Sequence, residues 1–190
     1  MFTLIRAFIA IPLPDEIIVT LAEIVKDLKS CLPKVSWVKP DNIHLTIKFL
    51  GNISEEKVLK IRQIMEKSCL GIAPFFLFGS GLSVFPNIKR ARVIWVGVKG
   101  DVSLLKTIHY TLDEGLKSLG FVKEDRSFTP HLTLGRIKKI INERVLIDVI
   151  KKYKNFSTSS FKVKEIVLFK SELHPKGAVY TPLERIYFKE

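Results

Sequence analysis

Two HLT motifs, at residues 44–46 and 131–133, combine a side chain suited to proton transfer with one that donates hydrogen bonds. Both are followed by further apolar residues, which predicts that each motif lies in a β-strand. In a strand, residues i and i+2 point to the same face. His44 therefore projects together with Thr46, and His131 with Thr133. If the two strands face each other, the cleft between them holds two imidazoles and two hydroxyls.

This set of side chains suits the hydrolysis of a phosphodiester without a metal. A water that attacks phosphorus needs a base, and the leaving alkoxide needs an acid. Imidazole serves either role near neutral pH, because its ordinary pKa is about 6.5. The hydroxyls of Thr46 and Thr133 can donate hydrogen bonds to the non-bridging oxygens, where negative charge accumulates.

Two other interpretations of the motifs are less well supported. A single histidine on a strand is most often a structural residue, but here the same motif recurs at matching places in the chain. A metal centre usually takes three or four ligands from His, Cys, Asp and Glu. Each motif offers one histidine beside a hydroxyl, and no carboxylate lies within either. We therefore expect no metal and no cofactor.

The elements that carry the motifs occur twice in the same order. The first half predicts a strand at 6–11, a helix at 14–30, a strand at 44–50, a helix starting at Ser54 and an extended segment at 75–85. The second half predicts a strand at 92–98, a helix after Asp101, a strand at 131–136, a helix starting at Asn142, a strand at 161–169 and a last strand at 185–188. The motif histidines are 87 residues apart. We predict one domain, residues 1–190, built from two related lobes at roughly 1–88 and 89–190, with strands possibly exchanged between them.

Composition narrows the class of protein. The chain has 190 residues, of which 47% are apolar, and a formal net charge of +12. This length fits one domain, and the charge favours an anionic partner. The sequence contains no apolar run of about 18 residues and begins without a signal-peptide pattern, so no membrane association is expected. Two cysteines without a CxxC motif predict reduced thiols and a cytoplasmic protein.

Beyond these motifs, the chain resembles the 2H phosphoesterase superfamily, and within it the RNA 2′,3′-cyclic phosphodiesterases, historically called 2′-5′ RNA ligases. The similarity runs nearly end to end. The matching segments are RAFIAIPLP (6–14), NIHLTIKFLG (42–51), VFPN (84–87), RVIWVGV (92–98), FTPHLTLGR (128–136) and SELHPKGAVY (171–180).

The resemblance implies a bilobal, pseudo-two-fold α+β fold, with antiparallel sheets lining a central cleft and helices outside. It implies hydrolysis of RNA 2′,3′-cyclic phosphate ends to 2′-phosphomonoesters, and also 2′-5′ ligation in reverse. His44 is then the proton donor and His131 the proton acceptor, with Thr46 and Thr133 binding phosphate. The expected partner is RNA with a cyclic phosphate end, bound by a monomer.

Four further residues are candidates for RNA binding: Lys48, Arg136, Arg126 and Phe128. Lys48 is four residues after His44, so simple alternation places it on the same face. Family analogy places Arg136 at the site, whereas alternation from His131 places it on the opposite face unless a bulge at Gly135 redirects it. Phe128 could stack on a base or belong to the core.

Two alternative functions remain open on the sequence. A non-catalytic RNA-binding module would also use the positive charge, although binding alone does not require the duplicated motif. A phosphodiesterase acting on a small cyclic nucleotide or a nucleotide-sugar cyclic phosphate would need the same two histidines.

Overall fold

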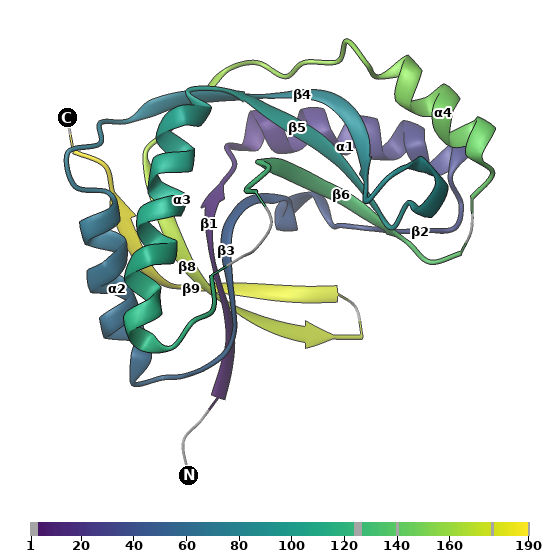
Figure 1. Ribbon diagram of the computed structural model, residues 1–190. Coiled ribbons are helices and arrows are strands. Elements are labelled where there is room, and N and C mark those ends of the chain that lie inside the picture. Colours follow the sequence, from purple (N-terminus) through teal and green to yellow (C-terminus); the bar gives the residue numbers. More distant parts are fainter. Residues whose placement is uncertain (1–3, 124–126, 140, 176, 190) are drawn as a thin grey trace.

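A computed structural model describes residues 4–123, 127–139, 141–175 and 177–189 (Figure 1). Its helices are α1 (Asp15–Cys31), α2 (Lys57–Ser68), α3 (Val102–Leu116) and α4 (Glu143–Lys152), with 3-10 turns η1 (Pro40–Asn42), η2 (Ile88–Arg90) and η3 (Lys117–Leu119). Its strands are β1 (Leu4–Pro12), β2 (Val35–Trp37), β3 (His44–Ser54), β4 (Phe75–Phe85), β5 (Val93–Gly100), β6 (His131–Ile137), β7 (Phe161–Val163), β8 (Glu165–His174) and β9 (Gly177–Tyr187).

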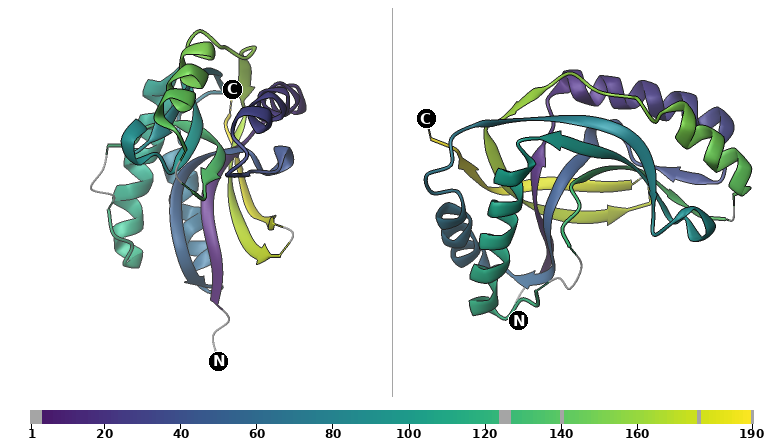
Figure 2. Two further views of the ribbon diagram at one scale, coloured as in Figure 1. Left: turned by 90° about the vertical axis from the view of Figure 1, so that its right-hand side faces the viewer. Right: turned by 45° about the horizontal axis from the view of Figure 1, so that its top comes forward.

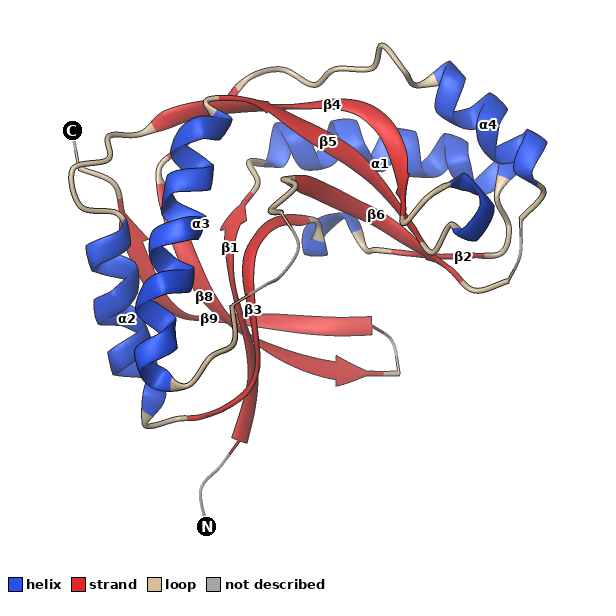
Figure 3. Ribbon diagram, viewed as in Figure 1, coloured by secondary structure: helices blue, strands red, loops and turns tan. Residues whose placement is uncertain are grey.

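Within the described residues, the nine strands form one curved antiparallel sheet (Figure 3). Eight of them follow the order β7-β4-β5-β6-β3-β1-β8-β9, and β2 pairs with the far end of β6. The helices pack on the outer face of the sheet. The hydrophobic core lies between them and the sheet, as the buried side chains of α1 and α3 show. The predicted α+β class with a sheet-lined cleft is confirmed.

The two motif strands meet at a single residue pair. β3 and β6 are joined only by Leu45 opposite Leu132, the central residues of the two HLT motifs. These leucines are 87 residues apart, which is also the spacing of the motif histidines. The approximate two-fold axis that relates the halves therefore passes beside this pair. One HLT motif lies on each side of it.

The two halves of the chain exchange elements around this axis. β4, from the first half, pairs with β5, whereas β8, from the second half, pairs with β1. The helices exchange in the same way, because α2 packs beside α3 and α1 beside α4 (Figures 1 and 2). Each end of the molecule is thus built from both halves of the chain.

Local sequence accounts for the buried face of α1 and for the start of α4. Ile17, Leu21, Ile24 and Leu28 recur at helical spacing and are buried along α1, and Asn142 caps α4 by accepting a hydrogen bond from the Arg144 amide. The predicted start of α2 at Ser54 is wrong. Ser54 is still paired with Leu4 in the sheet, and the helix begins at Lys57. No helix within the described ranges is long and apolar enough to cross a membrane.

Candidate active site

A β-bulge in β3 decides which side chains share the face of His44. Ala10 pairs with Thr46 but the next residue, Ile9, pairs with Lys48, so Ile47 is an extra residue in β3. From this point on, the alternation of β3 side chains between the two faces of the sheet is shifted by one residue. Phe49, rather than Lys48, then joins His44 and Thr46 on the concave face, where Phe49 is 57% exposed.

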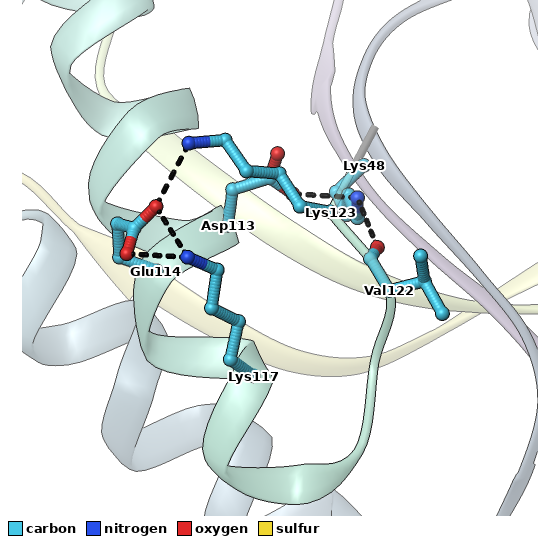
Figure 4. A network of polar contacts seen from close by, with 6 residues as sticks. All are labelled: Lys48, Asp113, Glu114, Lys117, Val122 and Lys123. Carbon is cyan, nitrogen blue, oxygen red and sulfur yellow. Dashed lines mark hydrogen bonds and ion pairs between the residues drawn. The ribbon is translucent and has the colours of Figure 1, made fainter. Parts of the chain in front are cut away.

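The expected position of Lys48 is therefore wrong. Its side chain points to the helical side of the sheet and is 3% exposed, and its ammonium group lies 2.5 Å from the carboxylate of Asp113 on α3. It also donates a hydrogen bond to the Val122 carbonyl at 3.3 Å (Figure 4). A buried, paired lysine on this side of the sheet is not placed to contact RNA in the cleft.

The equivalent bulge in β6 has the opposite consequence for Arg136. Trp95 pairs with Thr133 and Ile94 with Gly135, which leaves Leu134 as the extra residue. Arg136 consequently projects on the same face as His131 and Thr133, and it is exposed there. The bulge that the sequence suggested at Gly135 is present, but its extra residue is Leu134. Arg136 therefore faces the cleft, as the family resemblance implied.

Gly135 itself allows β2 to approach β6 closely. A Cβ atom at this position would lie 2.6 Å from Val35 Cγ1 and 2.9 Å from Trp37 Cε3, shorter than ordinary contacts. We predict that Gly135→Ala lowers the free energy of unfolding by about 1–3 kcal/mol, as overpacking does. Denaturant unfolding measures the change, with Ser36→Ala on exposed β2 surface as control. An equal effect of both substitutions would contradict the close approach.

A cavity of about 640 Å³ lies against the concave face. Its wall includes His44, Thr46, Thr133 and Arg136, and β1, β2, β8, β9 and η1 complete it. The charged residues in the described wall are Arg6, Lys39 and Arg136, with no carboxylate among them. A concave, positively charged site of this size suits a phosphate group with an attached nucleoside.

Each motif histidine is oriented by a backbone carbonyl two residues earlier. His44 Nδ1 lies 2.8 Å from the Asn42 oxygen, and His131 Nδ1 lies 2.7 Å from the Thr129 oxygen. Because a carbonyl only accepts, each Nδ1 must carry the proton and donate. Nε2 is then the nitrogen left available for proton exchange. The two rings are prepared for proton transfer in the same way.

Aromatic side chains enclose both imidazoles. Phe8 stacks on His44 with ring centroids 4.7 Å apart, and Tyr180 meets the same ring edge-on at 5.2 Å. Around His131, Phe85 and Trp95 lie at 5.0 and 5.8 Å. These contacts restrict rotation of the rings and remove water from around them.

Burial controls the protonation of the two histidines. Desolvation lowers the pKa of His44, although the hydrogen bond to Asn42 opposes the shift, and the nearby His131 charge lowers this pKa further. Desolvation also lowers the pKa of His131, against the opposing hydrogen bond to Thr129, with Arg136 lowering it further. Both groups therefore favour the neutral form in the absence of substrate.

The other two residues predicted to bind RNA are Phe128 and Arg126. Phe128 is half-buried and stacks on His109, with ring centroids 4.2 Å apart, so one of its faces is covered within the protein. Arg126 lies outside the described residues. Within the described ranges, no group of three or more His, Cys, Asp and Glu side chains is arranged to hold a metal.

Several cleft residues were not predicted as site residues. Arg6, Phe49 and Tyr180 line the cavity, and Phe8 and Trp95 contact the histidines. Phe8 and Trp95 are 87 residues apart, so the internal repeat could have paired them. The internal repeat does not point to Tyr180, because this residue comes beside His44 only through the β8–β9 hairpin.

Two histidines with defined tautomers, two threonines and a cationic cavity are chemically suited to acid–base reactions of phosphate esters. Comparison with known proteins agrees with this class. The family described as LigT like Phosphoesterase matches the chain twice, at residues 11–95 and 97–180. The chain belongs to this family of phosphoesterases.

Individual relatives support the same assignment. A Methanocaldococcus jannaschii protein named RNA 2′,3′-cyclic phosphodiesterase is 38% identical over 175 residues, 92% of this chain and 96% of the relative. One of the same name from Methanothermobacter thermautotrophicus is 34% identical, over 95% of this chain and 97% of its own. The crystal structure of E. coli LigT complexed with 3′-AMP superposes with a TM-score of 0.77 at 25% identity, covering 99% of this chain and all of the other.

Proposed function

We propose that this phosphoesterase hydrolyses the 2′,3′-cyclic phosphate at the end of an RNA and leaves a 2′-phosphomonoester. The observation that carries the proposal is the pair of equivalent histidines, each of which donates its Nδ1 proton to a backbone carbonyl. His44 lines a cavity whose described charged wall residues are cationic, and Thr133 of the second motif lines it too. The names of the archaeal relatives support RNA as the substrate, and the 3′-AMP complex supports binding of a nucleotide in this fold.

In the proposed reaction, His131 Nε2 accepts a proton from water while the water oxygen forms a bond to phosphorus. The bond from phosphorus to the 3′-oxygen breaks, and His44 Nε2 donates its proton to that oxygen. The phosphate stays on the 2′-oxygen. Placement of acid and base on either side of the two-fold axis suits an in-line displacement, with each proton transfer contributing about 10²–10⁴-fold in rate.

The remaining cleft residues stabilise charge and position the RNA. The hydroxyls of Thr46 and Thr133 donate hydrogen bonds to the non-bridging oxygens, and Arg136 supplies positive charge beside them. Arg6 and Lys39 extend the positive potential along the cavity wall toward the phosphates of adjoining nucleotides.

Comparing turnover of an RNA ending in a 2′,3′-cyclic phosphate with that of a mononucleoside 2′,3′-cyclic phosphate tests the substrate. We expect a higher kcat/KM on the RNA end, because only the longer substrate reaches Arg6 and Lys39. Faster turnover of the mononucleotide would favour the small cyclic nucleotide. Salt-sensitive RNA binding without turnover of either substrate would favour the non-catalytic module.

The lowered histidine pKa values predict a specific pH dependence. The active free enzyme has one imidazolium and one neutral imidazole, and both pKa values lie below the ordinary 6.5. We expect kcat/KM to follow a bell-shaped profile with its maximum on the acidic side of 6.5, since the acid loses its proton as pH rises. The bound phosphate anion favours imidazolium, so the alkaline limb of kcat lies at higher pH. Rates that do not vary between about pH 5 and 8 would contradict this assignment.

The same site also suits the joining of RNA ends. A 5′-hydroxyl in place of water would lose its proton to His131 and bond to phosphorus, while the bond to the 3′-oxygen breaks and His44 protonates that oxygen, so the product would carry a 2′-5′ linkage. The near-symmetry of the site would let the two histidines exchange roles when this linkage is cleaved again by the 3′-hydroxyl. We propose that hydrolysis dominates in water and that joining occurs when RNA ends are held together.

A further inference from the structure

The β8–β9 hairpin reaches past the rest of the sheet. β8 pairs with β1 only from Val167 to Lys170, and within the described residues its remaining part, from Ser171 onward, pairs only with β9. Figure 1 shows this end of the hairpin projecting beyond β1. Because a two-stranded hairpin alone is only marginally stable, this end needs another attachment to stay in place. The part of it that lines the cavity, here called the hairpin arm, consists of Ser171, Leu173, Pro175, Gly177, Ala178 and Tyr180.

Asn42, the last residue of η1, supplies this attachment. Its side-chain Nδ2 donates a hydrogen bond of 2.7 Å to the Ala178 carbonyl. Since a carbonyl only accepts, the amide nitrogen of Asn42 is the atom that faces the arm. The stem of Lys39 lies against the arm beside it, because a Cβ atom at Gly177 would be 3.3 Å from Lys39 Cε. The η1 turn and the residue before it thus hold the arm at the start of β9.

The same residue also holds the imidazole of His44. The backbone carbonyl of Asn42 accepts the Nδ1 hydrogen bond of His44 at 2.8 Å. Tyr180, two residues after Ala178, meets that ring edge-on with centroids 5.2 Å apart. The arm and His44 are therefore connected twice, through Asn42 and through Tyr180. An arm that moved away from η1 would take Tyr180 off His44 and open the ring to water.

The equivalent residue in the second half bonds within its own segment. Thr129 stands 87 residues after Asn42, and its carbonyl orients His131 in the same way. The hydroxyl of Thr129, however, donates to the Ser127 carbonyl two residues earlier, at 3.4 Å. A change at Asn42 should therefore affect His44, and His131 serves as an internal reference.

We propose that Asn42 is a positioning residue, which holds the hairpin arm in place as a wall of the RNA-binding cavity and keeps Tyr180 against the imidazole of His44. The apolar side chains of Leu173, which is 70% exposed, and Pro175 then pack against the nucleoside beside the cyclic phosphate. The inference rests on the proposed function for its effect on RNA turnover. Its effect on the His44 ring can be measured without turnover.

Asn42→Ala removes the bond to Ala178 and leaves the backbone carbonyl that orients His44. The RNA must then order the freed arm itself, and the loss of one hydrogen bond of ordinary net strength corresponds to about tenfold in an equilibrium constant. We expect KM for an RNA with a 2′,3′-cyclic phosphate end to rise about tenfold. Because both histidines keep their carbonyl partners, kcat should change much less than KM.

Asn142→Ala is the matched control. It also removes a hydrogen bond of an asparagine side chain, the one that caps α4 at the Arg144 amide, and Asn142 is not among the cavity-wall residues. Loss of a helix cap lowers stability. We nevertheless expect wild-type kcat and KM, so a general loss of stability would not imitate the change expected in Asn42→Ala.

The deciding measurement is the exchange with water of the imidazole Nδ1–H protons, whose NMR signals are assigned with His44→Ala and His131→Ala. In Asn42→Ala, the His44 proton should exchange faster than in the wild type, while the His131 proton keeps its wild-type rate. An unchanged His44 rate in the folded variant, an equal increase for both histidines, or an unchanged KM would overturn the proposal.

Two further outcomes are separable. If Asn42→Ala does not fold, Asn42→Ser, whose hydroxyl lies one bond closer to the backbone and falls short of the Ala178 carbonyl, is measured against the same signals and the same control. A wild-type enzyme without turnover, but with the expected change in His44 exchange in the variant, would refute the proposed function and leave the positioning by Asn42 intact.

Discussion

His44→Ala and His131→Ala are each expected to lower kcat by about 10²–10⁴-fold, because each removes one of the two proton transfers. KM for the cyclic phosphate should change less, since the proposed phosphate-binding residues Thr46, Thr133 and Arg136 remain in the cavity wall. The double variant should be only slightly slower than the worse single variant, because an acid and a base that act in one step are not additive. Initial rates on an RNA with a 2′,3′-cyclic phosphate end measure all three.

His174→Ala provides the control for this series. His174 is exposed at the end of β8 and is not among the cavity-wall residues. Its removal should leave kcat within about twofold of wild type, far less than the loss of one catalytic proton transfer. Wild-type activity in the double variant His44→Ala/His131→Ala would contradict the acid–base account.

Asp113→Ala is expected to produce the largest loss of stability, about 3–5 kcal/mol, because it leaves the Lys48 charge buried without its carboxylate. For a chain of this size, each kcal/mol lowers the unfolding midpoint by about 2–4 °C. Thermal and denaturant unfolding at neutral pH measure the loss.

Glu66→Ala is the comparison for this effect. It removes an ion pair with Arg62 on α2, where both side chains are nearly half exposed and four residues apart. Such pairs contribute about 0.3–0.5 kcal/mol. Equal losses of unfolding free energy in Asp113→Ala and Glu66→Ala would show that the buried ion pair contributes no more to stability than the exposed one.

The internal repeat is the feature that sequence predicted best. The spacing of 87 residues predicted two equivalent strands, and the structure joins them at Leu45 and Leu132. The HLT pattern placed each histidine beside its threonine, because alternation holds for three residues without interruption.

Prediction failed where alternation is interrupted. The extra residues Ile47 and Leu134 reset the two faces of each strand, which buries Lys48 and brings Arg136 into the cleft. A bulge depends on the pairing between strands, and the pattern of one strand does not reveal it. The position of Tyr180 could not be predicted from the pattern of one strand either, because only the folded chain brings it beside His44.

The most direct test of the central claim is the position of the phosphate in the product. The wild-type enzyme is incubated in excess EDTA with an RNA that ends in a 2′,3′-cyclic phosphate, and the product end is identified by 31P NMR. The two-histidine account predicts undiminished turnover and a 2′-phosphomonoester as the product. A 3′-phosphomonoester, or loss of activity in EDTA that added metal restores, would contradict it.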